Sequence, residues 1–149
     1  MLKGSGKCGS LIGWFFETYS IEQFSKGGQF ELKALSDLNL SNISITLSQG
    51  AYIPSRNSNS ESVDGYWQDK NSQILYLFQV TRSYSHPVNA SGIIALIKEL
   101  NISVDELAIK LIFVVPYGMA SNFSKQTINM EPLNIDAESD VAALNGVGP

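Results

Sequence analysis

Three polar side chains lie in apolar surroundings between residues 63 and 87, and their types suit metal-dependent chemistry. Asp64 precedes the segment GYW, while Gln79 and Thr81 lie near the end of the apolar run ILYLFQVT. Burying a polar side chain without a partner costs about 1–3 kcal/mol, so each of these residues needs a structural or functional reason. If the two segments form a hairpin with a four-residue loop at 70–73, Asp64 lies directly opposite Gln79 and Thr81 shares their face.

The first predicted helix adds a second carboxylate, Glu17. Two carboxylates and an amide oxygen are hard oxygen ligands of the kind that Mg²⁺ prefers. We therefore predict that Glu17, Asp64 and Gln79 hold Mg²⁺, and that Asp64, Gln79 and Thr81 form the catalytic set. Each also has a purely structural explanation. Glu17 suits a solvated helix face, Asp64 a turn before Gly65, Gln79 a core amide bonded to backbone, and Thr81 any strand.

The elements that position these residues are predicted from apolar spacing and from glycine and proline breaks. Leu11, Phe15 and Tyr19 repeat at helical spacing after a plausible N-cap at Ser10. Residues 74–80 and 109–115 are apolar on both faces, as expected of strands covered on both sides. The predicted elements are a helix ending at the glycines 27–28, strands at 29–35 and 43–48, the hairpin strands carrying Asp64 and Gln79, a helix at 89–101, a strand at 109–115 and a short final helix beginning near Phe123 and Gln126.

This order, α-β-β-β-β-α-β, predicts an α/β fold with a central mixed sheet flanked by helices. We expect a single domain at residues 10–128, between a flexible lead-in at 1–9 and an acidic, disordered tail at 129–149. The last nineteen residues contain four acids and no Lys or Arg, whereas residues 1–130 contain ten acids and ten bases. The net charge of −4 therefore belongs to the tail. A neutral body lacks the clustered basic face typical of nucleic-acid-binding domains, which counts against DNA as a partner without excluding it.

Several functional classes are excluded by what the sequence lacks. A single cysteine, Cys8, and a single histidine, His86, allow neither an internal disulfide nor a Cys/His zinc site. The GSGK segment lacks the earlier glycine and the following Ser or Thr of a phosphate-binding loop. Ser85 and His86 would point to opposite faces of a strand, and no G-x-S-x-G motif is present. The apolar runs are too short to span a bilayer, and no signal-peptide pattern follows MLKGSGKCGS.

An acid on one strand, an acid or amide on the next and a lysine two residues later form the PD-(D/E)XK nuclease pattern. The segments GWFFETYSIEQFSKGGQFELKAL, VDGYW, YLFQVTRSYSHPV, GIIAL and LIFVVP, with a later F..Q, resemble the nuclease-like domain of Crinkler-type effectors and their retrotransposon hot-spot relatives. The resemblance covers residues 10–126. It implies a restriction-endonuclease-like fold and Mg²⁺-dependent cleavage of DNA inside a host cell, often in the nucleus. Glu17, Asp64 and Gln79 match the metal-binding positions.

Thr81 occupies the position at which the nuclease pattern has lysine, although the Gln-x-Thr strand is typical of many Crinkler-type members. The other cations offer no compelling replacement; they are Lys70, Lys98, Arg56 and Arg82. A catalytically inactive module that binds a host protein or nucleic acid therefore remains an alternative, as does a structural fragment of a longer effector. The sequence predicts no membrane partner and indicates neither an oligomeric state nor a compartment.

Overall fold

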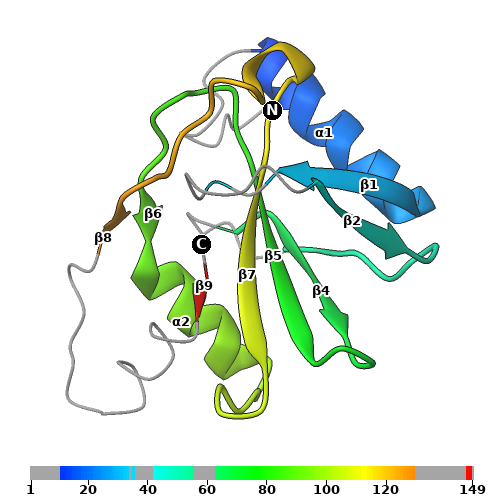
Figure 1. The fold of residues 1–149 in the computed structure, drawn as a ribbon, viewed down its shortest axis with the longest axis vertical. Helices are drawn as coiled ribbons and strands as arrows, with labels where there is room; N and C mark the ends of the chain where they lie inside the picture. The colour runs from blue at the N-terminus through cyan, green and yellow to red at the C-terminus, as the bar shows by residue number, and fades with distance from the viewer. Residues whose placement is uncertain (1–10, 34, 36–41, 56–62, 130–146, 149) are drawn as a thin grey trace.

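The main sheet is built around β5 (Ile74–Val80), which lies between two strands of opposite orientation (Figure 1). The computed structural model describes residues 11–33, 35, 42–55, 63–129 and 147–148. β4 (Gly65–Asp69) pairs with β5 antiparallel, and β7 (Ala108–Val114) pairs with β5 parallel. Two short strands, β3 (Ile53–Pro54) and β9 (Val147–Gly148), extend the two edges. The protein is thus a mixed α/β structure with a mixed sheet, as predicted.

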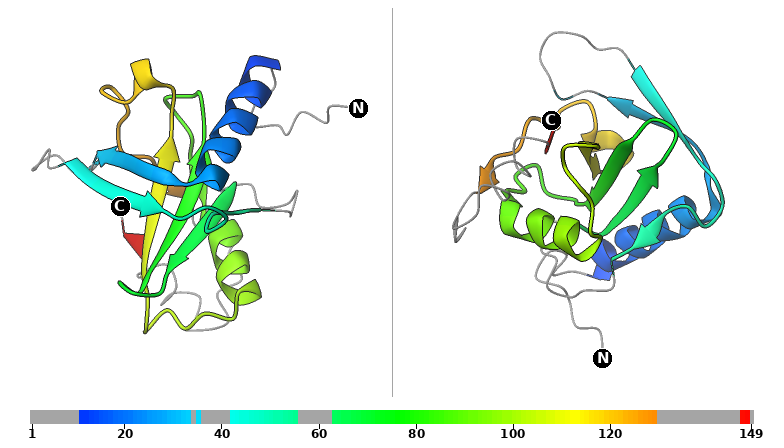
Figure 2. Two further views of the ribbon diagram at one scale, coloured as in Figure 1. Left: turned by 90° about the vertical axis from the view of Figure 1, so that its right-hand side faces the viewer. Right: turned by 90° about the horizontal axis from the view of Figure 1, so that it is seen from below.

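Two helices and a separate hairpin cover this sheet. The helices are α1 (Leu11–Lys26) and α2 (Ala90–Glu99), and the hairpin consists of β1 (Gly28–Lys33) and β2 (Asn42–Leu47). Among the described residues β1 and β2 pair only with each other, so they form a second sheet and do not extend the central one. The hairpin and α2 lie on opposite sides of the main sheet (Figure 2). No helix in the described part of the chain is long and apolar enough to cross a membrane.

The two faces of β5 belong to two different cores, as the period-2 alternation of a strand requires. Leu75 and Leu77 pack with the apolar stripe of α2, whereas Tyr76 and Phe78 pack with Phe24 of α1 and with the hairpin. The prediction that residues 74–80 form a central strand covered on both faces is confirmed, because Leu75 to Val80 are all buried.

The helix α1 is confirmed, but the apolar residues used to predict it do not face the sheet. Leu11, Phe15 and Tyr19 are 57–60% exposed. The buried positions of this helix are Gly13, Ser20 and Phe24. The helix is apolar on several sides, so spacing alone identifies the helix without identifying the buried face.

Three further expectations differ from the structure. The strand at 109–115 is only half-buried after Ile109, and residues 110–115 line a cavity beside the sheet. No helix begins at Phe123; a short 3₁₀ turn, η1 (Tyr117–Met119), precedes it, and Gln126 lies in irregular chain. β8 (Ile128–Asn129) then pairs with β6 (Val88–Asn89). The expected lead-in at 1–9 and most of the expected tail, residues 130–146, lie outside the described residues.

Gly65 is required where β4 begins, because the phenol ring of Tyr52 lies directly over its Cα. A methyl group at this position would overlap the Tyr52 ring. We predict that Gly65→Ala lowers the free energy of unfolding by about 1–3 kcal/mol, the usual cost of overpacking a core. Gly118→Ala is the matched control, since a Cβ there meets no atom within 4 Å. Urea unfolding of both variants measures the effect, and equal stabilities would contradict this explanation of Gly65.

Candidate functional site

Asp64 and Gln79 meet across the β4–β5 hairpin. Gln79 Nε2 donates to Asp64 Oδ2 at 2.9 Å, and the backbone N–H of Val80 donates to the same oxygen at 2.7 Å. Gly65 pairs with Phe78 and the connecting loop is 70–73, so the predicted register is confirmed. The Asp64 carboxylate therefore acts as a hydrogen-bond acceptor for the neighbouring strand just before β4 begins.

Gln79 is fully buried, at 0% exposure, and only one end of its amide has a partner. Its nitrogen also lies 3.4 Å from the carbonyl oxygen of Val80. Its oxygen, Oε1, is buried without a hydrogen-bond partner. A buried unsatisfied acceptor costs about 1–3 kcal/mol, and such groups in native structures call for an explanation. Of the structural alternatives considered for Gln79, a fully satisfied core amide does not fit.

Tyr52 is influenced electrostatically by both Asp64 and Glu17 of α1. Its side chain is buried among Phe24, Phe78 and Gly65, and its hydroxyl has no hydrogen-bond partner. Burial raises the pKa of Tyr52 well above its ordinary value, and the negative charges of Asp64 and then Glu17 raise it further. Both carboxylates therefore act on the same phenol. Glu17 is half-buried and does not lie on a solvated helix face.

Thr81 lies two residues after Gln79 and therefore on the same face of the strand. Its N–H donates to the carbonyl of Val114 at 2.9 Å, which extends the pairing with β7 past Val80. Its side chain is 2% exposed. The hydroxyl oxygen accepts from the N–H of Ser83 at 3.0 Å and lies 3.4 Å from Nδ1 of His86. Thr81 is thus bonded to a loop residue that the sequence analysis had not placed in the site.

The fit of these residues to Mg²⁺ follows from their donor atoms. Among the described residues no three His, Cys, Asp or Glu side chains gather as a metal-binding group. Mg²⁺ does not need one, because it is usually held by one or two carboxylates and keeps several waters. Asp64 and Gln79 meet in the structure and would supply one carboxylate and the buried amide oxygen Oε1. Glu17 belongs to α1, whose Phe24 packs on the Tyr76–Phe78 face of β5, whereas Gln79 alternates with Leu75 and Leu77 on the α2 face. A shared Mg²⁺ site for Glu17, Asp64 and Gln79 therefore stays a prediction.

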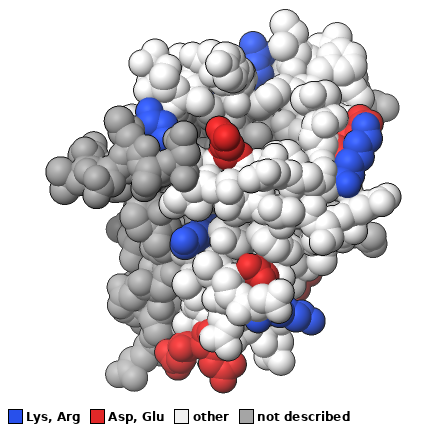
Figure 3. All heavy atoms as spheres, turned by 45° about the vertical axis from the view of Figure 1, so that its right-hand side comes forward, with Lys and Arg blue, Asp and Glu red and all other residues white. Residues whose placement is uncertain are grey.

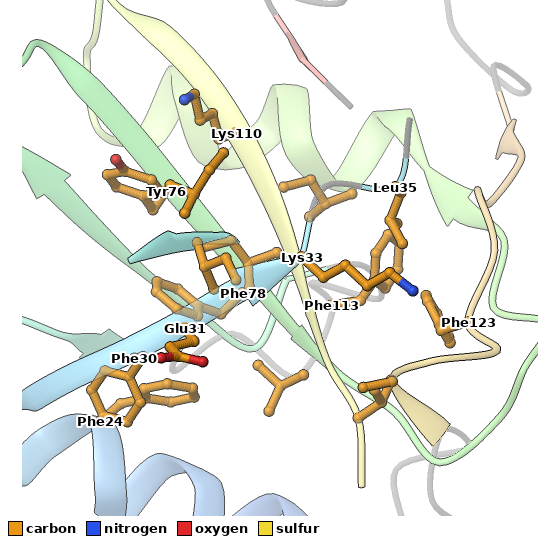
Figure 4. A pocket seen from close by; sticks show the side chains of 17 residues that line it. Phe24, Phe30, Glu31, Lys33, Leu35, Tyr76, Phe78, Lys110, Phe113 and Phe123 are labelled. Carbon is orange, nitrogen blue, oxygen red and sulfur yellow. The ribbon is translucent and has the colours of Figure 1, made fainter. Parts of the chain in front are cut away.

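A cavity of about 360 Å³ lies elsewhere, between the β1–β2 hairpin and the face of the main sheet that carries Tyr76 and Phe78 (Figure 4). Its walls are aromatic and aliphatic, with Lys33 and Lys110 among the lining side chains. None of Glu17, Asp64, Gln79 or Thr81 lines it. This cavity is therefore separate from the polar cluster.

Basic side chains do not gather on the surface in Figure 3. Lys and Arg groups lie apart from one another there, interspersed with Asp and Glu on a largely uncharged face. This agrees with the neutral body expected from the sequence. Lys70 and Lys98, considered as substitutes for the missing lysine, are both exposed, and Arg56 lies outside the described residues.

Comparison with models of known protein families, with curated proteins and with solved structures finds no match. The functional argument therefore depends on the geometry of the cluster itself. Sequence reasoning missed Tyr52 because an isolated tyrosine outside any motif carries no signal. It set His86 aside as a loop residue, since its contact with Thr81 depends on how that loop folds back.

The burial of Tyr52, reinforced by the charges of Asp64 and then Glu17, predicts an effect of pH on stability above pH 10. The folded protein holds the Tyr52 proton more tightly than the unfolded chain, whose tyrosines ionise near pH 10. Below that pH the group has no effect; above it stability falls, by up to about 1.4 kcal/mol per pH unit. We expect Tyr52→Phe to weaken this loss and to change stability little at pH 8. Urea unfolding at pH 8, 10 and 11 tests this, with the fully exposed Tyr117→Phe as control. If the stability of Tyr52→Phe fell with pH as steeply as that of the wild type, the raised pKa of Tyr52 would be refuted.

Proposed function

We propose that this chain is a PD-(D/E)XK-type domain related to Crinkler effectors, and that it hydrolyses phosphodiester bonds in DNA with Mg²⁺. The observation that carries the proposal is the Asp64–Gln79 hydrogen bond across the hairpin, with Thr81 following on the same strand. The nuclease pattern places its metal-binding acid, its second ligand and its third polar residue at these positions. The order of the long elements, α1, β1, β2, β4, β5, α2 and β7, agrees with that pattern.

In this proposal the three oxygen ligands come from three separate elements. Asp64 precedes β4, Gln79 belongs to β5 and Glu17 belongs to α1. Mg²⁺ held there would stabilise the negative charge that develops on the scissile phosphate. The hydrogen bonds from Gln79 and Val80 fix the orientation of the Asp64 carboxylate, so that little of its side-chain freedom remains to be lost on binding.

The first test is cleavage of plasmid DNA in the presence of Mg²⁺ or Mn²⁺. We expect nicking or linearisation that chelation abolishes and that Asp64→Asn reduces by about 10²-fold or more, the size typical for loss of an electrostatic stabiliser. Glu17→Gln is expected to act in the same direction. Glu106→Gln is the control, because Glu106 is exposed and belongs to the turn after α2. Cleavage that persists unchanged in Asp64→Asn would assign the activity to a contaminant or to another site.

The second test measures metal binding without requiring turnover. Gln79→Glu places a second carboxylate against Asp64, and close like charges destabilise a fold that lacks a compensating cation. We expect this variant to melt below the wild type without metal and to gain more stability than the wild type on addition of Mn²⁺. A ligand at 100 times its Kd adds about 2.7 kcal/mol. Gln29→Glu, on the exposed strand β1, is the control for adding an acid. Equal Mn²⁺ responses in the two variants would refute a metal site at Gln79.

The second candidate function is a catalytically inactive module that binds a partner protein. It is favoured by the exposed apolar side chains of α1, which include Leu11, Ile12, Phe15 and Tyr19 at 57–64% exposure. The inactive module predicts no cleavage by the wild type with any divalent ion. If the partner were instead nucleic acid, its affinity would fall steeply with added salt, whereas a partner held by this apolar surface would show little salt dependence.

A further inference from the structure

The chain beyond β5 folds back so that an imidazole lies against Thr81. Ser83 forms the turn: its N–H donates to Thr81 Oγ1 at 3.0 Å, and its hydroxyl donates to the carbonyl of Ser85 at 2.7 Å. The N–H of Ser85 returns a 3.3 Å hydrogen bond to the same Ser83 hydroxyl. These bonds return His86, five residues after Thr81, to within 3.4 Å of the Thr81 hydroxyl.

A second segment holds this loop from outside. The Gln126 side chain accepts from the N–H of His86 at 2.6 Å and donates to the carbonyl of Tyr84 at 3.0 Å. The Nε2 atom of Gln126 also donates to the carbonyl of Ser124, two residues earlier. Directly after the loop, the N–H of Val88 donates to Thr127 where β6 meets β8. His86 is therefore held on both sides by backbone bonds to the 124–128 segment.

The imidazole lies against the hydroxyl of Thr81, the residue that stands at the lysine position of the nuclease pattern. Side chains at 79 and 81 share one face of the strand, one repeat or about 7 Å apart. A lysine carries its ammonium on a four-carbon stem, whereas the threonine hydroxyl lies close to the backbone. The His86 ring lies 3.4 Å from that hydroxyl, and the hydroxyl belongs to the strand face that carries Gln79, which bonds Asp64.

We propose that His86 is the proton-transfer group of this site, with Thr81 and Gln126 as its positioning residues; the proposal rests on the phosphodiesterase function proposed above. Histidine is the side chain most often used for general acid–base catalysis, and its ordinary pKa is near neutrality. As a base it would carry its proton on Nδ1 and donate it to Thr81 Oγ1, and Nε2 would be the atom that accepts a proton from water. The threonine oxygen has two lone pairs, one for Ser83 and one for the imidazole.

The chemical step balances with water as the only co-reactant. The oxygen of a water molecule forms a bond to phosphorus while one of its protons passes to His86 Nε2. The bond from phosphorus to the leaving sugar oxygen breaks, and that oxygen takes a proton from solvent. His86 then returns its proton to solvent, so that one phosphodiester and one water yield a phosphomonoester and an alcohol.

The test compares His86→Gln and His86→Ala with the wild type in metal-dependent DNA cleavage. We expect kcat to fall by about 10²–10⁴-fold, the contribution typical of a proton-transfer group, while KM and Mn²⁺ binding measured by titration stay near the wild-type values. Added free imidazole should restore part of the rate in His86→Ala and leave the wild type unchanged. A purely structural role for His86 would not produce this rescue.

Positioning through the threonine hydroxyl is tested at Thr81 itself. Thr81→Val removes the hydroxyl at nearly constant volume, and we expect it to lose more kcat than Thr81→Ser, which keeps it. Equal losses in the two variants would refute the role of the hydroxyl.

The outcomes separate this proposal from the proposed function. If the wild type cleaves DNA and His86→Gln cleaves it at the same rate, the role of His86 is overturned while the nuclease function stands. The same conclusion follows if imidazole fails to restore activity in a folded His86→Ala protein that binds Mn²⁺. If the wild type cleaves no DNA with Mg²⁺ or Mn²⁺, the proposed function and this role fall together.

Discussion

The site depends on one carboxylate that completes a strand. At the beginning of β4, the Oδ2 atom of Asp64 accepts hydrogen bonds from the Gln79 side chain and from the Val80 backbone. Hydrogen bonds to a carboxylate are roughly twice as strong as those between neutral groups, and these two are partly buried. They join the chain before β4 to the central strand. Replacing Asp64 would therefore leave the Val80 N–H and the Gln79 amide nitrogen without this acceptor. Under the proposed function, Asp64 would thus have a structural and a chemical role at once.

The pairing of Asp64 with Gln79 could be predicted because it is local. Two strands joined by a four-residue loop have a register that follows from loop length and alternation, and the structure has that register. The buried strand β5 could be predicted for a similar reason, since a run that is apolar on both faces has to be covered on both. The face of α1 could not be predicted. Leu11, Phe15 and Tyr19 look like a core stripe, but Gly13 and Ser20 face inward, and only tertiary packing decides between two apolar sides.

Contacts between residues far apart in the chain were beyond sequence reasoning. Tyr52 lies over Gly65 and is influenced by Glu17, which is 35 positions away, and no motif marks that relationship. Gln126 was expected in a helix, whereas its side chain bonds the backbone of the 84–86 loop. A glutamine forms such bonds when two irregular segments pass close together, and periodicity carries no information about irregular segments. The polar cluster was therefore predicted in part, through its hairpin, and without the residues around it.

Under the proposed function, the burial of position 81 gives a physical reason for a threonine where the nuclease pattern has a lysine. Thr81 is 2% exposed, and a lysine there would have to place an ammonium in a site with little access to solvent. Burying such a charge costs several kcal/mol unless it is well paired. A threonine that contacts Ser83 and His86 avoids that cost, and the nearest imidazole nitrogen then belongs to a half-buried loop residue. The position of that nitrogen depends on the 83–86 turn and on Gln126, so the proposed chemistry would be coupled to a segment more than forty residues further along the chain.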